Sequence, residues 1–420
     1  MMKIKIRTMP PRWIPLLPKL LSGAACGMLL YTWSVFIRPL YVEFAWSRAD
    51  IAAAFSICCL VFGLTACVSE HLYSRFGIRS VFTAGNVILS MGFFLTGFVH
   101  SHLQLYVTYG LIAGFGGGII YMAPILTVFR WPHDRSVKAS FILLTAGLGL
   151  GAFVMAPIAA WLMIIPDYGW RYAFWYCGAA MGLMAFISGI FLLYCSKDGM
   201  SESQETTLPE TVQSLPRAIL TFVGKETARD PGLRLFYAAY FFHLLACLMV
   251  IGHMADLAIN QGLNAIAAAG AVSILALTNA AARFLSGYFI EKIGMKVYVA
   301  SLFALQAGGM VFLYPAGGSQ VALYIIAALI GWNYGGMIKI LSAVRIKDDR
   351  VAEQKGICGF LFILWALAGC TGPWIGGYLK DFTGDYYLSF ICGAILCAAG
   401  GLIIAAMKIP PQVPAEKVLH

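Results

Sequence analysis

Apolar segments of roughly 20 residues or more recur along the whole chain, and each is long enough to cross a bilayer as a helix. We find twelve, with approximate ranges 17–41, 51–73, 81–100, 103–129, 139–163, 174–195, 235–259, 266–290, 297–315, 320–343, 356–378 and 387–407. The first is not expected to be a cleaved leader, because it is too long and a second apolar segment follows almost at once. The sequence therefore predicts an all-α membrane protein with twelve transmembrane helices.

The composition agrees with a bilayer as the solvent. Charged residues make up 11% of the 420 residues, whereas an ordinary soluble domain has about 25%. The eleven cysteines are scattered through apolar segments without a CxxC pair, so we interpret them as small hydrophobic side chains. We expect no disulfide framework, no metal site and no cofactor.

The basic residues favour one orientation in the membrane. With both termini in the cytoplasm, the inside segments hold 23 of the 29 Lys and Arg residues. The outside loops hold four, which are Arg38, Arg48, Arg171 and Lys380. This bias obeys the positive-inside rule. The net charge of +10 is thus a signal of topology, and we expect no nucleic-acid partner because no basic domain lies outside the membrane.

One long polar connection, from Ser196 to Arg234, divides the segments into two groups of six. Similar stretches recur in the two groups at an offset near 217 residues, for example "YSRFGIRSV" (Tyr73–Val81) and "IEKIGMKVY" (Ile290–Tyr298). Two further pairs occur in the fourth and fifth segments of each group. The repeat predicts two pseudo-symmetric six-helix bundles, at 1–195 and 235–420, joined by a cytoplasmic central loop at 196–234.

The segment "ILALTNAAARFLSGYFIEKIG" (Ile274–Gly294) carries Arg283 well inside an apolar helix. A charge at the centre of a membrane helix costs about 2.5–3.5 kcal/mol on insertion scales, so it needs an explanation. One interpretation is that Arg283 snorkels toward the cytoplasmic end of its helix. The other is an anion site, because a guanidinium pairs bidentately with a carboxylate and Asn279, at i−4, lies on the same face.

Few other fixed charges accompany Arg283, which favours a singly charged anion. Lys339 is the one rival cation within a predicted span, and its position near the cytoplasmic end favours snorkelling. The aromatic candidates for substrate contact are Tyr31, Trp33, Tyr121, Trp332 and Tyr334. Tyr121 and Tyr334 lie at matching glycine-rich places in the two halves, although any one aromatic side chain in such a chain can equally serve packing.

His253 and Asp256 are candidates for a proton site in the segment "ACLMVIGHMADLAIN". Their i, i+3 spacing places them on one helix face. Histidine titrates near physiological pH, and an anion that crosses with a proton carries no net charge. Two other interpretations remain open: His253 as a packing residue, and Asp256 as a solvated side chain near the outer interface.

Two parallel six-helix halves are the plan of the major facilitator superfamily, which the chain resembles over essentially its whole length. The loop signature of that family, G-x-x-x-D-R-x-G-R-R, is recognisable as "GYFIEKIGMK" in the second half. In the first half it reads "EHLYSRFGIR", with Glu70 in place of the glycine and Ser74 in place of the aspartate. The resemblance implies a substrate site near the midplane between the halves and alternating access.

Within that superfamily the chain resembles the monocarboxylate transporters and the related oxalate/formate antiporters. The stretches that carry the resemblance are "YTWSVFIRPL…FAWSRADIAAAFSI", "RWPHDR", "GWRYAF" and, above all, "NAAARF". The last implies that Asn279 and Arg283 are the carboxylate site. The antiporter's second cation is matched by Trp365, which disfavours a dicarboxylate. The pattern is similar to a bacterial lactate/proton symporter, which implies Asn279, Arg283, His253, Tyr121 and Tyr334 as binding residues.

We therefore expect a secondary transporter in a bacterial inner membrane that carries L-lactate or pyruvate with a proton. In this hypothesis Arg283, Asn279, Tyr31, Tyr121, Tyr334 and His253 contact the substrate, and His253 with Asp256 handles the proton. The alternative is a monocarboxylate or formate/oxalate-type anion exchanger. We find neither a nucleophile–base pair nor a sensor output domain, so we expect no enzyme, and nothing in the pattern requires an oligomer.

Overall fold

The computed structural model describes residues 17–130, 135–165, 169–197, 231–316, 318–337 and 351–407, and these residues are almost entirely helical. The first helices are α1 (Leu17–Tyr31), α2 (Trp33–Phe44), α3 (Arg48–Phe76), α4 (Ile78–Thr96), α5 (His102–Leu105), the π-helical η2 (Tyr106–Ala113), α6 (Gly114–Arg130), α7 (Arg135–Ile164) and α8 (Gly169–Lys197). The later helices are α11 (Pro231–Asn260), α12 (Ala265–Ile293), α13 (Met295–Ala316), α14 (Gln320–Gly336), α15 (Val351–Thr383) and α16 (Tyr387–Ala406).

Every predicted span contains a helix, and the expected all-α membrane fold is confirmed. Within the described ranges, eight helices are long and apolar enough to cross a membrane. The bent pair α1 and α2, which meet at 41°, adds a ninth when it is counted as one span. The predicted central loop, both termini and Lys339 lie largely or wholly outside the described residues, so the domain limits stay a prediction.

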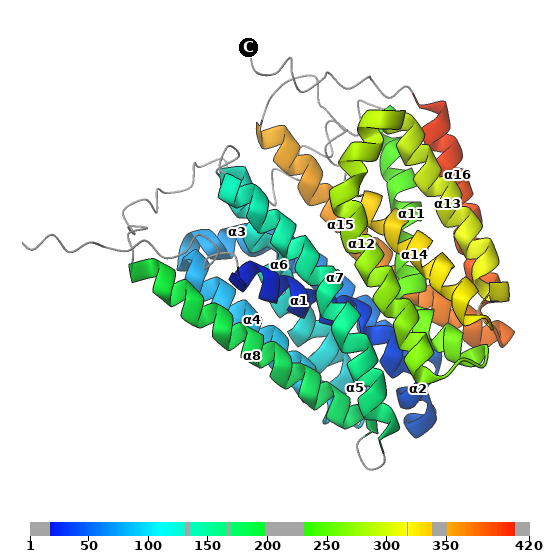
Figure 1. Cartoon of the computed structure of the whole chain (residues 1–420), viewed down its shortest axis with the longest axis horizontal. Helices are drawn as coiled ribbons and strands as arrows, with labels where there is room; N and C mark the ends of the chain where they lie inside the picture. The colour runs from blue at the N-terminus through cyan, green and yellow to red at the C-terminus, as the bar shows by residue number, and fades with distance from the viewer. Residues whose placement is uncertain are drawn as a thin grey trace, which may run out of the picture.

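The helices form two groups that lie side by side in Figure 1. Helices α1 to α8, in blue to green, make one group, and α11 to α16, in green to red, make the other. The groups approach each other near α2 and diverge toward the opposite end, where α16 ends. The most extensive contacts between them are those of α3 with α15 and of α7 with α12, and α2 also packs against α11.

Glycines on α7 make these close contacts possible. A Cβ atom added to Gly147 or Gly151 would overlap a backbone carbonyl oxygen of α1, at Leu20 or Ala24. A Cβ atom on Gly149 would lie 2.5 Å from the Cβ atom of Ala280 on α12. These glycines let α7 lie directly against a helix of each group.

Candidate functional site

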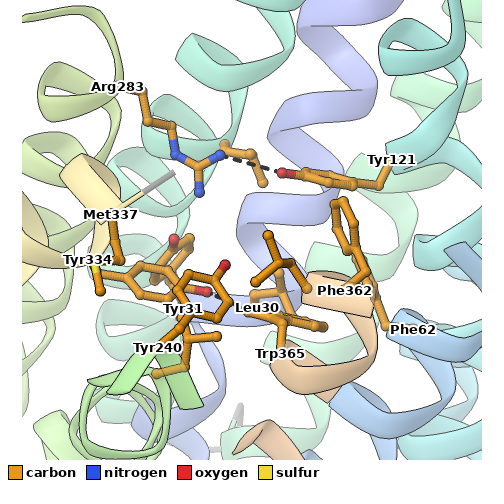
Figure 2. A pocket seen from close by; sticks show the side chains of 13 residues that line it. Leu30, Tyr31, Phe62, Tyr121, Tyr240, Arg283, Tyr334, Met337, Phe362 and Trp365 are labelled. Atoms are coloured by element: carbon orange, nitrogen blue, oxygen red, sulfur yellow. Dashed lines mark hydrogen bonds between the residues drawn. The ribbon is translucent and has the colours of Figure 1, made fainter. Parts of the chain in front are cut away.

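Arg283 lies inside the molecule, with only 8% of its surface exposed. Its Nε atom donates to Oδ1 of Asn279 at 2.9 Å, one helical turn earlier on α12. Its Nη1 atom donates to the hydroxyl of Tyr121 at 3.3 Å, so the guanidinium also contacts α6 of the other group (Figure 2). The interpretation that Arg283 snorkels to solvent is therefore wrong for this arrangement.

No carboxylate of the described residues forms an ion pair with Arg283. The ion pairs among the described residues are Arg48–Asp256, Arg171–Glu43 and His102–Asp50. The groups around the guanidinium are neutral: the amide of Asn279 and the phenols of Tyr31, Tyr121 and Tyr334. A buried cation with neutral partners attracts an anion, because burial is costly for an uncompensated charge.

Two hydrogen-bond donors beside Arg283 are available to such an anion. Asn279 is only 1% exposed, and its Oδ1 atom accepts from Arg283. The Nδ2 atom of Asn279 has no partner among the described residues. The hydroxyl of Tyr121 accepts from Arg283, so its own proton can be donated elsewhere. Guanidinium, amide and phenol together offer a carboxylate several charge-assisted hydrogen bonds.

The guanidinium faces a pocket of about 650 Å³, part of which is open to the outside. Helices of both groups line it, through Leu30 and Tyr31 of α1, Phe62 of α3, Tyr121 of α6, Leu148 of α7, Tyr240 and Leu244 of α11, Arg283 of α12, Tyr334 of α14, Met337, and Leu361, Phe362 and Trp365 of α15. Arg283 is the one charged residue among them. The indole Nε1 of Trp365 donates to the hydroxyl of Tyr334 at 2.6 Å.

The structure brings together most of the predicted contact residues. Arg283, Tyr31, Tyr121 and Tyr334 line the pocket, and Asn279 orients Arg283 from the preceding turn. Two other aromatic candidates lie elsewhere: Trp33 stacks on Phe55 at 6.1 Å, and Trp332 packs against Phe289 at 5.3 Å. Phe62, Tyr240 and Phe362 were not predicted, because nothing distinguishes them from other aromatic residues in a chain that is 14% aromatic.

His253 and Asp256 do not line this pocket and form a separate buried cluster. Asp256 is fully buried, and its Oδ2 atom accepts from Nε of Arg48 at 2.9 Å, the hydroxyl of Tyr386 at 2.7 Å and Nδ2 of Asn260 at 2.9 Å. The interpretation of Asp256 as a solvated interfacial side chain is therefore wrong. Arg48, expected in an outside loop, begins α3 and is only 6% exposed.

The imidazole of His253 extends this cluster to α15. Its Nδ1 atom lies 3.0 Å from the hydroxyl of Tyr386, and its Nε2 atom lies 2.7 Å from the carbonyl oxygen of Pro373. Since Arg48 belongs to the first group of helices and the other members to the second, the cluster joins the two groups. We call the set Arg48, Asp256, Tyr386 and His253 the buried relay.

The comparison with family models identifies the chain. The model described as Major Facilitator Superfamily matches residues 20–373. The chain belongs to the major facilitator superfamily. Membership agrees with the helical fold and makes this a multi-pass membrane transporter, which is not an enzyme.

The relatives and structural neighbours of this major facilitator protein are transporters. It is 28% identical over 411 residues to human Monocarboxylate transporter 11, covering 94% of this chain and 82% of the relative. It is 22% identical to the uncharacterized MFS-type transporter YhjX of Escherichia coli, over 79% of each chain. Among solved structures, a bacterial homolog of the human lysosomal transporter Spinster, in an inward-facing, occupied conformation, matches with a TM-score of 0.73 at 14% identity, covering 97% of this chain and all of the other.

A D-xylose–proton symporter matches with a TM-score of 0.67 at 15% identity, over 95% of this chain and 98% of the other. At such identities the structures support the fold alone.

Proposed function

We propose that this major facilitator protein carries a monocarboxylate of the L-lactate and pyruvate class together with a proton, by alternating access between its two helical halves. The observation that carries the proposal is the buried guanidinium of Arg283, which faces a pocket and has neutral partners. The monocarboxylate transporters among its relatives support the same substrate class. Its orientation, with both termini in the cytoplasm of a bacterium, is part of the proposal and rests on the distribution of basic residues.

Substrate binding follows from the groups around Arg283. One carboxylate oxygen accepts from the guanidinium and the other from the hydroxyl of Tyr121 or the free Nδ2 of Asn279. A second carboxylate would find no second cation among the described lining residues, where Arg283 is the one charged side chain and Trp365 lies on α15. The pocket therefore favours a monoanion over a dianion.

Proton binding follows from the hydrogen bonds of the buried relay. The carbonyl of Pro373 can only accept, so Nε2 of His253 carries a hydrogen. Tyr386 has a single proton, which it donates to Asp256. Nδ1 of His253 can then donate to the Tyr386 oxygen only when the imidazole is protonated. With a neutral imidazole, the lone pair of Nδ1 would face the lone pairs of the Tyr386 oxygen and repel them. Otherwise Tyr386 would have to donate its proton to Nδ1, and Asp256 would lose that hydrogen bond.

The relay connects this proton to the conformation of the protein. Arg48 and Asp256 neutralise each other across the two halves, and rocking of the halves would separate them. A proton on His253 adds a hydrogen bond to Tyr386 in the joined arrangement and so favours it. Lys380, Asp381 and Asp385 also lie near this cluster, and because their charges stay the same when His253 is protonated, the added proton is the net change, which the substrate anion can balance.

The test is uptake of labelled L-lactate into proteoliposomes with an inward proton gradient and no internal substrate. Accumulation that collapses when a protonophore is added supports proton symport. Rapid uptake only after preloading with lactate, formate or oxalate would make the protein an exchanger and remove the proton role from His253. No uptake under either condition would contradict monocarboxylate transport. The control variant is Arg171→Gln, which alters the partly exposed ion pair between Arg171, near the start of α8, and Glu43.

A further inference from the structure

Four of the aromatic side chains that line the pocket lie next to one another. The ring of Phe62 lies 5.5 Å from that of Tyr121 and 5.3 Å from that of Trp365, and Tyr121 lies 5.9 Å from Phe362. We call these four residues the aromatic wall. Phe62 and Tyr121 come from the first group of helices, and Phe362 and Trp365 both come from α15 (Figure 2).

Tyr121 ties this wall to the carboxylate site. Its hydroxyl accepts from Arg283, while its ring is a member of the wall. A carboxylate that binds at the contact between Arg283 and Tyr121 is therefore separated from the aromatic wall by no more than the length of one phenol side chain. A ligand with a short linker between its carboxylate and an aromatic ring spans that distance.

Apart from the hydroxyl of Tyr121, which belongs to the carboxylate site, the wall offers ring faces and no free hydrogen-bonding group to the tail. The indole nitrogen of Trp365, which can only donate, is already bonded to the hydroxyl of Tyr334. Phe62 and Phe362 have no polar atoms. The methyl group of lactate would cover little of this aromatic surface, whereas an aryl ring would form offset or edge-to-face contacts.

The charge of the pocket also excludes one kind of aryl substrate. No acidic residue is among the described residues that line it, so an ammonium group beside the carboxylate would lie near Arg283 without a counter-charge from them. The pocket thus favours aryl acids over aromatic amino acids. We propose that the aromatic wall selects monocarboxylates with an aromatic ring a few atoms from the carboxylate. This proposal rests on the proposed carboxylate site at Arg283 and adds the nature of the tail.

A matched set of probes tests the tail separately from the carboxylate. L-3-phenyllactate is L-lactate with a phenyl ring on its methyl group, and L-phenylalanine has an ammonium group in place of the hydroxyl. We would measure the dissociation constant of each with the purified full chain by titration calorimetry. We expect L-3-phenyllactate to bind at least about tenfold more tightly than L-lactate, and L-phenylalanine to bind more weakly than L-3-phenyllactate.

Two variants assign the effect to the wall. Phe362→Leu removes a ring without removing a polar group, and it should weaken binding of L-3-phenyllactate several-fold and by a larger factor than binding of L-lactate. Phe312→Leu is the matched control, because Phe312 is 64% exposed on α13 and is not part of the pocket. Trp365→Phe keeps a ring at the wall and should retain the preference for the aryl acid. This second variant keeps the test valid if Phe362→Leu does not fold.

The outcomes separate this proposal from the proposed function. Equal affinity for L-lactate and L-3-phenyllactate, with both lost in Arg283→Gln, would overturn the aryl preference and leave the carboxylate site standing. Binding of L-phenylalanine as tight as that of L-3-phenyllactate would overturn the exclusion of amino acids. No binding of either acid would contradict the carboxylate site, and the aryl proposal would fall with it.

Discussion

The Nε atom of Arg48 lies 2.9 Å from Oδ2 of Asp256, and this ion pair joins the first helix group to the second inside the protein. Both side chains are almost fully buried, at 8% and 0% exposure. Ser47 caps the start of α3 by accepting from the backbone N–H of Asp50, and so fixes the turn that presents Arg48. The ring of Tyr41 lies 3.9 Å from the Arg48 guanidinium carbon and covers its other side.

Asp256→Asn should destabilise the protein strongly, because it leaves the Arg48 cation buried without its counter-charge. Loss of one partner of a buried pair costs about 3–5 kcal/mol. Thermal unfolding of the purified protein measures the effect, and Arg48→Gln combined with Asp256→Asn should recover part of it. The exposed pair Arg171–Glu43 is the comparison, since its loss should cost about 1 kcal/mol or less. Equal losses at the two pairs would contradict the burial argument.

Arg283→Lys should abolish most binding of monocarboxylates even though it keeps the charge. Lysine lacks the planar fork that reaches Asn279 and Tyr121 together with a carboxylate. We expect the dissociation constant to rise roughly 100-fold, and more in Arg283→Ala. Calorimetric titration with L-lactate and L-3-phenyllactate measures it. Near-normal affinity in Arg283→Ala would rule out the anion site.

Tyr121→Phe should separate the hydroxyl of Tyr121 from its ring. The ring stays in the aromatic wall, while the hydroxyl that joins Arg283 is removed. A hydrogen bond to a charged group contributes about 1.5–3 kcal/mol, so affinity for both acids should fall by a similar factor of at least tenfold. Tyr73→Phe, whose hydroxyl bonds the carbonyl of Ile119 away from the pocket, is the control for loss of a buried phenol. A loss confined to the aryl acid would contradict this role.

Tyr386→Phe should weaken the dependence of uptake on an imposed pH gradient without preventing substrate binding. The hydroxyl of Tyr386 connects His253 to Asp256, and neither histidine nor aspartate lines the pocket. His253→Phe should have the same effect. The measurement is the initial rate of uptake between about pH 6 and 8, where histidine ordinarily titrates, beside the dissociation constant. An unchanged pH profile in both variants would remove the relay from proton coupling.

Gly151→Ala should destabilise the protein through the contact between α7 and α1. The added Cβ atom would overlap the carbonyl oxygen of Ala24, and such overpacking costs about 1–3 kcal/mol. Gly287→Ala is the matched control, because nothing lies within 4 Å of its Cβ position. Alanine in that helix interior should be neutral or stabilising. Thermal unfolding compares the two, and equal melting temperatures would contradict the packing role.

Much of this protein could be predicted from local pattern. Stretches of apolar residues longer than a bilayer is thick can fold in lipid only as helices, because every backbone polar group must be satisfied within the segment. The positions of the spans and the contrast between Arg283 and its apolar surroundings follow from that rule. The i−4 spacing likewise placed Asn279 on the same helix face as Arg283, where the structure has a hydrogen bond between them.

Contacts between distant segments were decided only by the tertiary structure. One interpretation of the sequence made Asp256 an interfacial side chain. In the structure, packing against α3 buries Asp256 beside Arg48, which is 208 residues away in sequence. His253 and Asp256 share a helix face as predicted, but the fold turns that face toward Tyr386 instead of the Arg283 pocket. Helix periodicity determines which residues share a face, whereas the neighbour that covers each face depends on how the helices pack together.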